Sequence, residues 1–487
     1  MKSADVAAIR QEEKLAIAAG TAEYELMCRA GIQAARYING KFPDALRVVI
    51  LAGGGNNGGD ALVAASHLRC PEVIVYSTKE KESFTGCAAL AVRDLPEKIP
   101  FIVRKKLDKF DFASGDVIVD GLLGIGFSGS HLREETANFI RTVNGSGLPV
   151  IALDLPSGVN GDTGIAAENG ALQCFATLTF GRPKKGLFCN DAVNLRGMLR
   201  VIDIGLPDDP NADGEEIFTN LDALTHLPCW EAACHKNSRG RVMVWGSSVE
   251  YPGAAALTSL AALKSGCGIV RCVSEADLSG RLCNAAIFKK LAPGEIPENF
   301  LNNSDTLVCG CGWGNSVSSA MLEAALNFSG SLVLDADALN FISRNPSLWG
   351  GHRQAVITPH PKEAERLMQA FDIPVGSDRR ENALHLAEKM GVVVLLKGKD
   401  TIAASPEGKY VIISSGNANL ATAGSGDVLA GVIGALLARK VPVFEAASLG
   451  AYIHGLAGEI AGKIIIADEL PDLVSVVLAK LSANEVI

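Results

Sequence analysis

The residues best suited to chemistry in this 487-residue sequence form the string Gly424-Ser-Gly-Asp427, directly before the apolar run 428–438. Glycines at the start of a helix leave backbone N–H groups free to bind an anion, such as the charge that develops on a phosphate group. The carboxylate of Asp427 could take a proton from a hydroxyl as the hydroxyl attacks phosphorus. The same string can also be a simple helix cap, so the motif alone leaves both interpretations open.

Other segments of the second half carry groups that suit a nucleotide site. The string Lys397-Gly-Lys-Asp-Thr401 follows an apolar run, so its lysines and turn amides could hold a phosphate, although a solvated charged hairpin is the simpler explanation. His360 stands between two prolines that fix its backbone at a strand end, which makes it a candidate substrate contact as well as an ordinary packed histidine. Asp335 and Asp337 follow a further strand, and 310–314 is a glycine-rich turn.

The first half has a glycine-rich loop of its own after an apolar strand. Gly53, Gly55 and Gly58 have the spacing of a dinucleotide-binding fingerprint, in which bare backbone approaches a pyrophosphate and helix N–H groups face it. The fingerprint alone is weak, because a tight turn can need the same glycines. The next strand also ends without the acid that would bind a ribose in an ordinary NAD site.

Two aspartates end later strands of the first half: Asp120, before a second glycine-rich loop, and Asp154. The carboxyl ends of parallel strands line one crevice, so we expect these loops to converge. Asn57, Asp120 and Ser157 would then offer hard oxygen donors suited to an alkali or alkaline-earth cation. Asp154 remains as a candidate acid or base, although an aspartate at a strand end is often only a cap or turn residue.

The elements that position these groups are apolar runs alternating with helical patterns. Runs that are apolar throughout indicate parallel strands covered by helices on both faces. Strands are predicted at 47–51, 73–76, 116–120, 149–153, 199–204, 241–245, 268–273, 306–309, 331–334, 355–357, 392–396 and 401–404. Helices are predicted at 60–68, 134–142, 254–264, 316–326, 361–370, 379–389 and 427–438. The sequence therefore predicts an α/β protein of two domains, joined within 205–230.

Composition narrows the class of protein. A net charge of −9 offers no basic excess that could neutralise a nucleic acid or an anionic membrane. No uninterrupted apolar run approaches the ~18–20 residues of a membrane helix, and no signal-peptide core follows Lys2. The 12 cysteines are scattered, and the one close pair, Cys309 and Cys311, lacks the further ligands of a zinc site. We expect reduced thiols in a cytoplasmic protein, with neither nucleic acid nor membrane as partner.

Four strings of the first half together resemble the epimerase half of the bifunctional NAD(P)H-hydrate repair enzymes. They are Asn56-Asn-Gly-Gly-Asp60, Asp120-x3-Gly124-x-Gly126, Asp154-x-Pro-Ser-Gly-Val-Asn-Gly161 and Thr179-Phe-Gly-x-Pro-Lys-x-Gly186. The resemblance implies a Rossmann-like three-layer αβα sandwich over residues 1–215. It also implies that this domain interconverts the R and S forms of NAD(P)HX, the hydrated nicotinamide that arises when NADH or NADPH is damaged.

The same resemblance implies the residues of the epimerase site. Asp154 would contact the substrate and serve in catalysis. The ligands of a K⁺ ion would be Asn57, Asp120 and Ser157. The dinucleotide would be bound, together with Asp154, by Asn56, Asn57, Gly58, Gly59, Asp60, Gly124, Ile125, Gly126, Phe127, Ser128, Gly129 and Ser130.

The second half resembles the other half of the same family, the ADP-dependent NAD(P)H-hydrate dehydratase, which has a ribokinase-like αβα fold. The resemblance places this domain at 222–487 and implies that the S hydrate is phosphorylated on its ring hydroxyl and then loses phosphate, which restores NAD(P)H. ADP is expected as the co-substrate, giving AMP and phosphate, with ATP as the variant and Mg²⁺ accompanying the nucleotide. Because the family is typically a homo-oligomer, the resemblance also implies an assembly of identical copies.

Within this domain the resemblance makes Asp427 the catalytic base. The hydrate pocket would be lined by Ala255, Gly314, His360 and Asp427. The nucleotide would be bound by Lys397, Gly398, Lys399, Asp400, Thr401 and Gly426. The sequence departs from the family pattern at Trp245, Trp313 and 418–420, which bears on substrate fit and rate.

Three other functions stay open at the level of sequence. An NAD(P)-dependent dehydrogenase would use the Gly53–Gly58 fingerprint but would leave the second half without a role. A small-molecule kinase, carried by the second half, would leave a stable phosphorylated product. A dinucleotide-sensing module without catalysis would have no need of Asp427 or Asp154.

Overall fold

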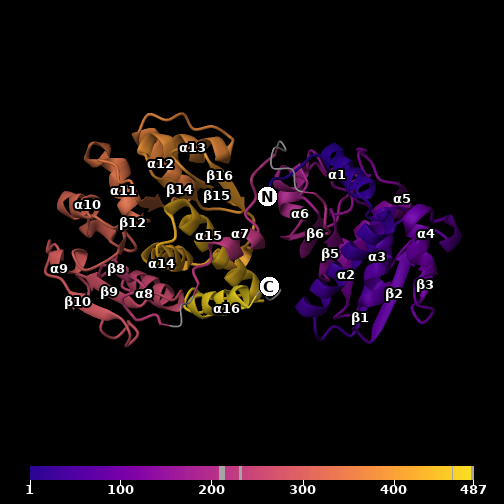
Figure 1. Cartoon of the computed structure of the whole chain (residues 1–487), viewed down its shortest axis with the longest axis horizontal. Helices are drawn as coiled ribbons and strands as arrows, with labels where there is room; N and C mark the ends of the chain where they lie inside the picture. The colour runs from indigo at the N-terminus through magenta and orange to yellow at the C-terminus, as the bar shows by residue number, and fades with distance from the viewer. Residues whose placement is uncertain (208–213, 230–232, 463, 484–487) are drawn as a thin grey trace. The chain divides into compact units, whose positions relative to one another are not determined.

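The computed structural model describes residues 1–207, 214–229, 233–462 and 464–483. The chain divides into two compact units, Met1–Glu216 and Ile217–Ile487, each with its own sheet (Figure 1). Residues 208–213, in the stretch where the sequence predicts the junction, lie outside the described residues, as do 484–487 at the end of the predicted second domain.

The first unit is built on a seven-stranded sheet with the order β3-β2-β1-β4-β5-β6-β7, in which all neighbours pair in parallel. Its strands are β1 (Arg47–Ala52), β2 (Glu72–Ser77), β3 (Phe101–Val103), β4 (Val117–Gly121), β5 (Val150–Leu153), β6 (Ala176–Phe180) and β7 (Met198–Ile202). Its helices are α1 (Val6–Ala18), α2 (Glu23–Lys41), α3 (Asn56–His67), α4 (Gly86–Arg93), α5 (Glu134–Ser146) and α6 (Ala192–Leu195).

Alternate residues of these strands enter two separate cores. Val48 and Ile50 pack with residues of α2, α3 and α4 on one face of the sheet, while Val49 and Leu51 pack with α5 on the other. Burial on both faces is the physical reason that the strands are apolar at every position. The result is three layers, with the sheet in the middle.

The second unit is built on a nine-stranded sheet with the order β10-β9-β8-β11-β12-β13-β14-β15-β16. Its strands are β8 (Arg241–Trp245), β9 (Ile269–Ser274), β10 (Ile287–Lys290), β11 (Thr306–Cys309), β12 (Ser331–Leu334), β13 (Ala355–Ile357), β14 (Val393–Leu396), β15 (Thr401–Ala404) and β16 (Tyr410–Ile413). Pairing is parallel from β10 to β14 and antiparallel from β14 to β16.

Helices cover both faces of this second sheet. They are α7 (Asn220–His226), α8 (Ala254–Lys264), α9 (Glu298–Leu301), α10 (Ser319–Leu326), α11 (Asp337–Arg344), α12 (Pro361–Ala370), α13 (Arg379–Met390), α14 (Ser425–Ala438), α15 (Val443–Ile460) and α16 (Leu470–Ser482). One core contains residues of α8, α14, α15 and α16, and the other contains residues of α10 to α13 (Figure 1).

Helix α14 runs through the first of these cores and carries Asp427 in its first turn. Every residue from Val428 to Ala438 is buried, so the helix needs cover on all sides, and α8 and α15 supply much of it. A Cβ atom on Gly431 would lie 2.3 Å from the Thr258 carbonyl oxygen of α8, so the close approach of the two helices requires glycine.

The α/β fold prediction is confirmed, and all of the predicted strands are present, within a residue or two at their ends. Four strands were not predicted: β3, β6, β10 and β16. β14 and β15 form an antiparallel hairpin, because the four residues that join them cannot make the crossover that parallel strands need. Within the described residues, no helix combines the length and apolarity that crossing a membrane requires.

A glycine substitution tests the packing of the first glycine loop against α3. A Cβ on Gly58 would lie 1.8 Å from the carbonyl oxygen of Gly53, and neither backbone segment can yield as a side chain would. We expect Gly58→Ala to lower the free energy of unfolding by about 1–3 kcal/mol or more. Gly126→Ala is the control, because a Cβ there meets nothing within 4 Å. Equal thermal unfolding midpoints for the two variants would contradict this packing.

Candidate active sites

The first candidate site is a cavity of about 490 Å³ at the carboxyl ends of the strands of the first unit. The loops after β1, β4, β5 and β6 all contribute to its lining, as the topology of a parallel sheet requires. Of the residues predicted from sequence, the cavity is lined by Asn56, Asn57, Asp60, Gly124, Ile125, Gly126, Phe127 and Asp154. Gly58 and Gly59 are buried in α3, while Ser128, Gly129 and Ser130 are exposed further along the second loop.

The two glycine loops meet through bare backbone. A Cβ on Gly53 would lie 1.9 Å from the carbonyl oxygen of Leu122, and a Cβ on Gly124 would lie 3.2 Å from the Asn57 side chain. Helix α3 starts at Asn56, so the N–H groups of its first turn lie beside the cavity and can receive an anion. The expected convergence of the loops is therefore what the structure shows.

Asn57, Asp120 and Ser157 are close together beneath the second glycine loop. The Ser157 hydroxyl donates to Asp120 Oδ1 at 2.6 Å, and the Ser157 N–H donates to Asp120 Oδ2 at 2.8 Å. Asn57 Nδ2 donates to the carbonyl oxygens of Leu123 at 2.8 Å and Leu153 at 3.1 Å. Burial raises the pKa of Asp120 to about 6, although the hydrogen bonds from Ser157 favour its charged form.

The side-chain oxygen of Asn57 is buried and accepts no hydrogen bond from any described residue. A buried polar atom of this kind normally has a partner. Hard cations prefer the oxygens that Asn57, Asp120 and Ser157 offer, so the donor set suits an alkali or alkaline-earth cation, the class to which the K⁺ implied by the resemblance belongs.

Asp154 lies in the cavity wall in an ion pair with Lys184. Its backbone has a φ of 67°, a strained conformation for a residue other than glycine, and its N–H donates to the Leu178 carbonyl at 2.7 Å. Lys184 is almost wholly buried and also donates to the Phe180 carbonyl at 2.9 Å and to Thr179 Oγ1 at 3.2 Å. Lys184 belongs to a string quoted above for the resemblance, but sequence reasoning gave it no role.

Three further carboxyl side chains line the same cavity, those of Glu13, Glu23 and Asp60. Burial raises the pKa of Glu13 and, more strongly, that of Asp60, and the neighbouring charge of Asp154 acts in the same direction. Lys184 opposes both shifts, and the charge of Arg10 also lowers the pKa of Glu13. Glu13 was not identified from the sequence, because no helix was predicted before residue 60.

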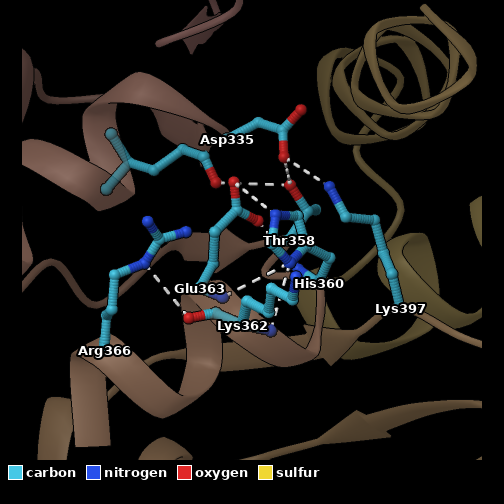
Figure 2. Close-up of polar contacts among 8 residues, drawn as sticks. Asp335, Thr358, His360, Lys362, Glu363, Arg366 and Lys397 are labelled. Carbon is cyan, nitrogen blue, oxygen red and sulfur yellow. Dashed lines mark hydrogen bonds and ion pairs between the residues drawn. The ribbon is translucent and has the colours of Figure 1, made fainter. Parts of the chain in front are cut away.

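The second candidate site lies at the strand ends of the second unit, around Asp335. Asp335 Oδ1 accepts a hydrogen bond from the Thr358 hydroxyl at 2.7 Å and pairs with Lys397 Nζ at 2.8 Å, as Figure 2 shows. Asp335 follows β12, Thr358 follows β13 and Lys397 follows β14. The ends of three adjacent parallel strands therefore bring a carboxylate, a hydroxyl and an ammonium group together.

Asp427 approaches this group from the start of α14. Ligand atoms of Cys311, Asp335 and Asp427 lie within 4.8 Å of one another. Burial raises the pKa of Asp427 to about 7, and the charge of Asp335 adds to the effect while Lys397 opposes it. A carboxyl with such a pKa can act as a base near neutral pH and gives up a proton as readily as it takes one.

The turn before Asp427 has the form of an anion site. Gly424 has a φ of 89°, which glycine adopts without strain, and a Cβ on Gly426 would lie 3.5 Å from Lys397 Nζ. Bare backbone, the start of a fourteen-residue helix and an ammonium group thus meet at one place. The Ser425 hydroxyl contacts His454 Nε2 at 3.1 Å, and burial lowers the pKa of His454 to about 4, so this imidazole is neutral. Sequence reasoning missed His454, because α15 was not predicted.

The three residues predicted to line the hydrate pocket with Asp427 are Ala255, Gly314 and His360. Ala255 N–H donates to Ser247 Oγ at 2.9 Å, and Gly314 N–H donates to Asp337 Oδ2 at 2.8 Å. His360 caps α12: its Nδ1 accepts from the N–H groups of Lys362 and Glu363, and partial burial and the charge of Lys397 lower its pKa (Figure 2).

The hairpin tip 397–401 is held by an arginine that sequence reasoning did not select. Arg379 donates to the carbonyl oxygens of Lys399 at 2.7 Å and Lys397 at 3.2 Å. Gly398 and Lys399 are exposed, whereas Lys397 turns toward Asp335. Residues 397–400 thus join the antiparallel strands β14 and β15, and the ammonium group of Lys397 pairs with Asp335.

Comparison with known proteins also divides the chain into two parts, each matching a different family model. Residues 23–186 match the family model of the YjeF-related protein N-terminus, and residues 242–477 match that of NAD(P)H-hydrate dehydratase. The bifunctional NAD(P)H-hydrate repair enzyme Nnr of Coxiella burnetii is 33% identical over 473 residues, which cover 93% of this chain and 94% of that protein. The chain belongs to the bifunctional NAD(P)H-hydrate repair enzymes. Nnr of Escherichia coli K12 is likewise 33% identical, over 93% of this chain and 88% of its own length.

The ribokinase-like fold of the second half of this NAD(P)H-hydrate repair enzyme is supported by a solved structure. A ribokinase-like superfamily protein from Enterococcus faecalis V583 aligns over 56% of this chain and 99% of its own, with a TM-score of 0.50 and 22% sequence identity. Membership in the repair family accounts for both halves at once, which the dehydrogenase and kinase hypotheses do not.

The raised pKa of Asp427 has a consequence for stability. Because the folded protein favours the neutral carboxyl, ionisation costs free energy that grows as pH rises from the unfolded pKa near 4 to the folded pKa of about 7. Asp427→Asn removes this cost. We expect its gain in unfolding free energy at pH 8 to exceed its gain at pH 5 by about 2 kcal/mol. Denaturant unfolding of both proteins at pH 5 and pH 8 checks this. An equal gain in unfolding free energy at the two pH values would show that the Asp427 carboxyl is solvated.

Proposed function

We propose that this chain repairs hydrated nicotinamide cofactors at two active sites that work in sequence. Residues 1–215 interconvert the R and S forms of NAD(P)HX, and residues 222–487 convert the S form to NAD(P)H with ADP as co-substrate. The observation that carries the proposal is that one chain of this family has two separate strand-end sites, each with carboxyl groups whose pKa is raised. The first site supplies the S form from the R form, which a stereospecific dehydratase would leave unrepaired.

In the dehydratase, Asp427 takes the proton of the ring hydroxyl as its oxygen attacks the terminal phosphorus of ADP. The bond from that phosphorus to the bridging oxygen breaks, and AMP leaves. The N–H groups around Gly426 and the ammonium group of Lys397 stabilise the charge that develops on the phosphoryl group. Phosphate is a far better leaving group than hydroxide, so the ring then loses phosphate and a proton from the adjacent carbon, which restores the double bond.

The other ligands of the dehydratase are those that the family resemblance implies. The hydrate is bound by Ala255, Gly314 and His360, and the nucleotide by residues 397–401 with Gly426. Mg²⁺ bound with the nucleotide would reduce the repulsion among its phosphates, and the carboxylates of Asp335 and Asp427 are donors that suit it. The Cys311 thiol does not suit it, because burial and these carboxylates raise its pKa and keep it protonated.

In the epimerase, Asp154 contacts the substrate ring, and its ion pair with Lys184 holds its carboxylate within the cavity wall. The first turn of α3 (residues 56–60) and the loop 124–130 bind the dinucleotide through backbone N–H groups. K⁺ held by Asn57, Asp120 and Ser157 would supply a fixed positive charge beneath these loops. The buried, unpartnered oxygen of Asn57 supports this assignment.

The setting of the protein is also a proposal. All twelve cysteines lie among the described residues and are free thiols, which fits the reducing cytoplasm. The acidic composition fits small-molecule ligands rather than nucleic acid or membrane as partners. By analogy with its family, the enzyme would act as a homo-oligomer.

Asp427→Asn tests the dehydratase. With mixed R and S NADHX and ADP, the wild-type chain is expected to restore the absorbance of NADH for the whole mixture. Loss of the general base should slow this by about 10²–10⁴-fold, even for the pure S form. Asp468→Asn, at an exposed position of the same unit, should leave the rate unchanged. A fully active Asp427→Asn variant would refute the mechanism, and a stable phosphorylated product from the wild type would favour a kinase.

Asp154→Asn tests the epimerase separately. We expect this variant to repair the S form at the wild-type rate and to leave the R form to slow spontaneous epimerisation, because the two sites share no catalytic residue. Asp44→Asn, on the surface of the same unit, is the control. If Asp154→Asn repaired pure R NADHX rapidly, with its fold checked by circular dichroism, Asp154 would have no catalytic role in the epimerase.

A further inference from the structure

Helix α1 lies over the cavity of the first unit although it precedes the segment that defines the family match. The family model begins at residue 23, whereas α1 covers Val6–Ala18. Three of its side chains, Arg10, Glu13 and Ile17, nevertheless line the cavity. The part of the site that α1 contributes is therefore not covered by the family model.

The helix is fixed in place by a buried ion pair. Arg182 Nη1 donates to Glu12 Oε1 at 2.5 Å, and both side chains are less than one tenth exposed. The same guanidinium donates to the carbonyl oxygens of Lys2 at 2.9 Å and Ser3 at 3.0 Å. A buried, fully engaged arginine is costly to rearrange, so α1 is held firmly next to the segment that carries Lys184.

Further contacts set the orientation of α1. Ala4 pairs with residues 183–185 through hydrogen bonds of 2.9 Å in both directions. Arg10 donates to the carbonyl oxygen of Ile125, in the second glycine loop, at 3.3 Å. Glu12 is directed into the protein and Arg10 contacts the second glycine loop. Glu13, which follows Glu12 on the helix, therefore faces the cavity.

The surroundings of Glu13 are those of a proton-exchanging group. The charges that act on it come from Asp154 and Lys184 across the cavity, Arg10 on its own helix and Glu23 at the start of α2, while Asp60 of α3 feels its charge in turn. It is half-buried, in a wall that also contains Ile17, Leu26 and Met27. Burial next to another carboxylate favours the neutral acid.

Epimerisation of the hydrate requires one group that accepts a proton and another that donates one, and a neutral carboxyl such as that of Glu13 could be the donor. The inverted carbon bears a hydroxyl and the ring nitrogen, so the ring can open when the hydroxyl loses its proton, a C=O bond forms and the C–N bond breaks. The electron pair of the C–N bond goes to nitrogen, which must receive a proton. After rotation, attack of nitrogen on the other face of the C=O carbon reverses both transfers, so no proton or electron is gained or lost.

We propose that Glu13 is a catalytic residue of the epimerase, which protonates the ring nitrogen while Asp154 accepts the proton of the hydroxyl. This inference rests on the proposed function and extends it to a helix outside the family match. On ring closure Glu13 takes its proton back and Asp154 returns the other. The ion pair with Lys184 holds in place the carboxylate of Asp154 that accepts the hydroxyl proton.

The test follows conversion of pure R NADHX to the S form by chromatography, using the full chain without ADP so that the dehydratase is idle. Glu13→Gln preserves the size of the side chain and removes its acid, so we expect a loss of about 10²-fold or more. Glu13→Asp should recover part of the rate. Lys14→Gln, at an exposed position of the same helix, is the control and should keep the wild-type rate.

The pH profile separates a chemical role from a structural one. The wild-type rate should fall at high pH as the acid loses its proton, and Glu13→Gln should lack this fall, whereas a variant that merely loosens α1 would keep it at a lower rate. A Glu13→Gln rate within threefold of wild type, or an unchanged profile, would overturn the inference and leave the proposed function intact. If the wild-type chain did not interconvert the R and S forms, the proposed epimerase would itself fail.

Discussion

A lysine held against an aspartate lies at the centre of each strand-end site: Lys184 with Asp154 in the first unit and Lys397 with Asp335 in the second. Each site also contains further carboxyl groups that are buried near this pair. Burial raises the pKa of Glu13 and Asp60 in one site and of Asp427 in the other, and the charge of the paired aspartate adds to the effect. Each unit thus has a carboxylate paired with a lysine beside a carboxyl whose pKa is raised, which is the pairing that acid–base catalysis uses.

The backbone provides the space in which these charges meet. Asp154, with a φ of 67°, and Ala336, with a φ of 48°, adopt conformations that cost free energy, and both follow strands that end at a site. Glycines at the loops let carbonyl groups approach where a Cβ atom would collide, as Gly53 does against Leu122. Strain and close approach are concentrated at the strand ends, while the sheets beneath them are regular and apolar.

The sequence was most informative where burial leaves a clear pattern. Strands buried on both faces are apolar throughout, so their ends, and with them Asp120, Asp154 and Asp335, could be located. Helix α15 is buried almost all round and has no polar face to reveal its period, so His454 could not be assigned. β10 carries two exposed lysines at a sheet edge, and few residues of α1 are buried, so neither gave a signal. The roles of Glu13 and Lys184 depend on long-range contacts that no local pattern contains.

The pairing of residues 2–4 has a consequence for biosynthesis. Ser3 exchanges hydrogen bonds with Glu215, 212 residues further along the chain, and Ala4 lies against 183–185. A nascent polypeptide emerges in order, so its first segment must wait, unpaired, until nearly the whole of the first unit has left the ribosome. Cotranslational folding of this unit should accordingly end with the docking of its earliest residues, and a long-lived intermediate would expose the unfinished cavity to chaperones.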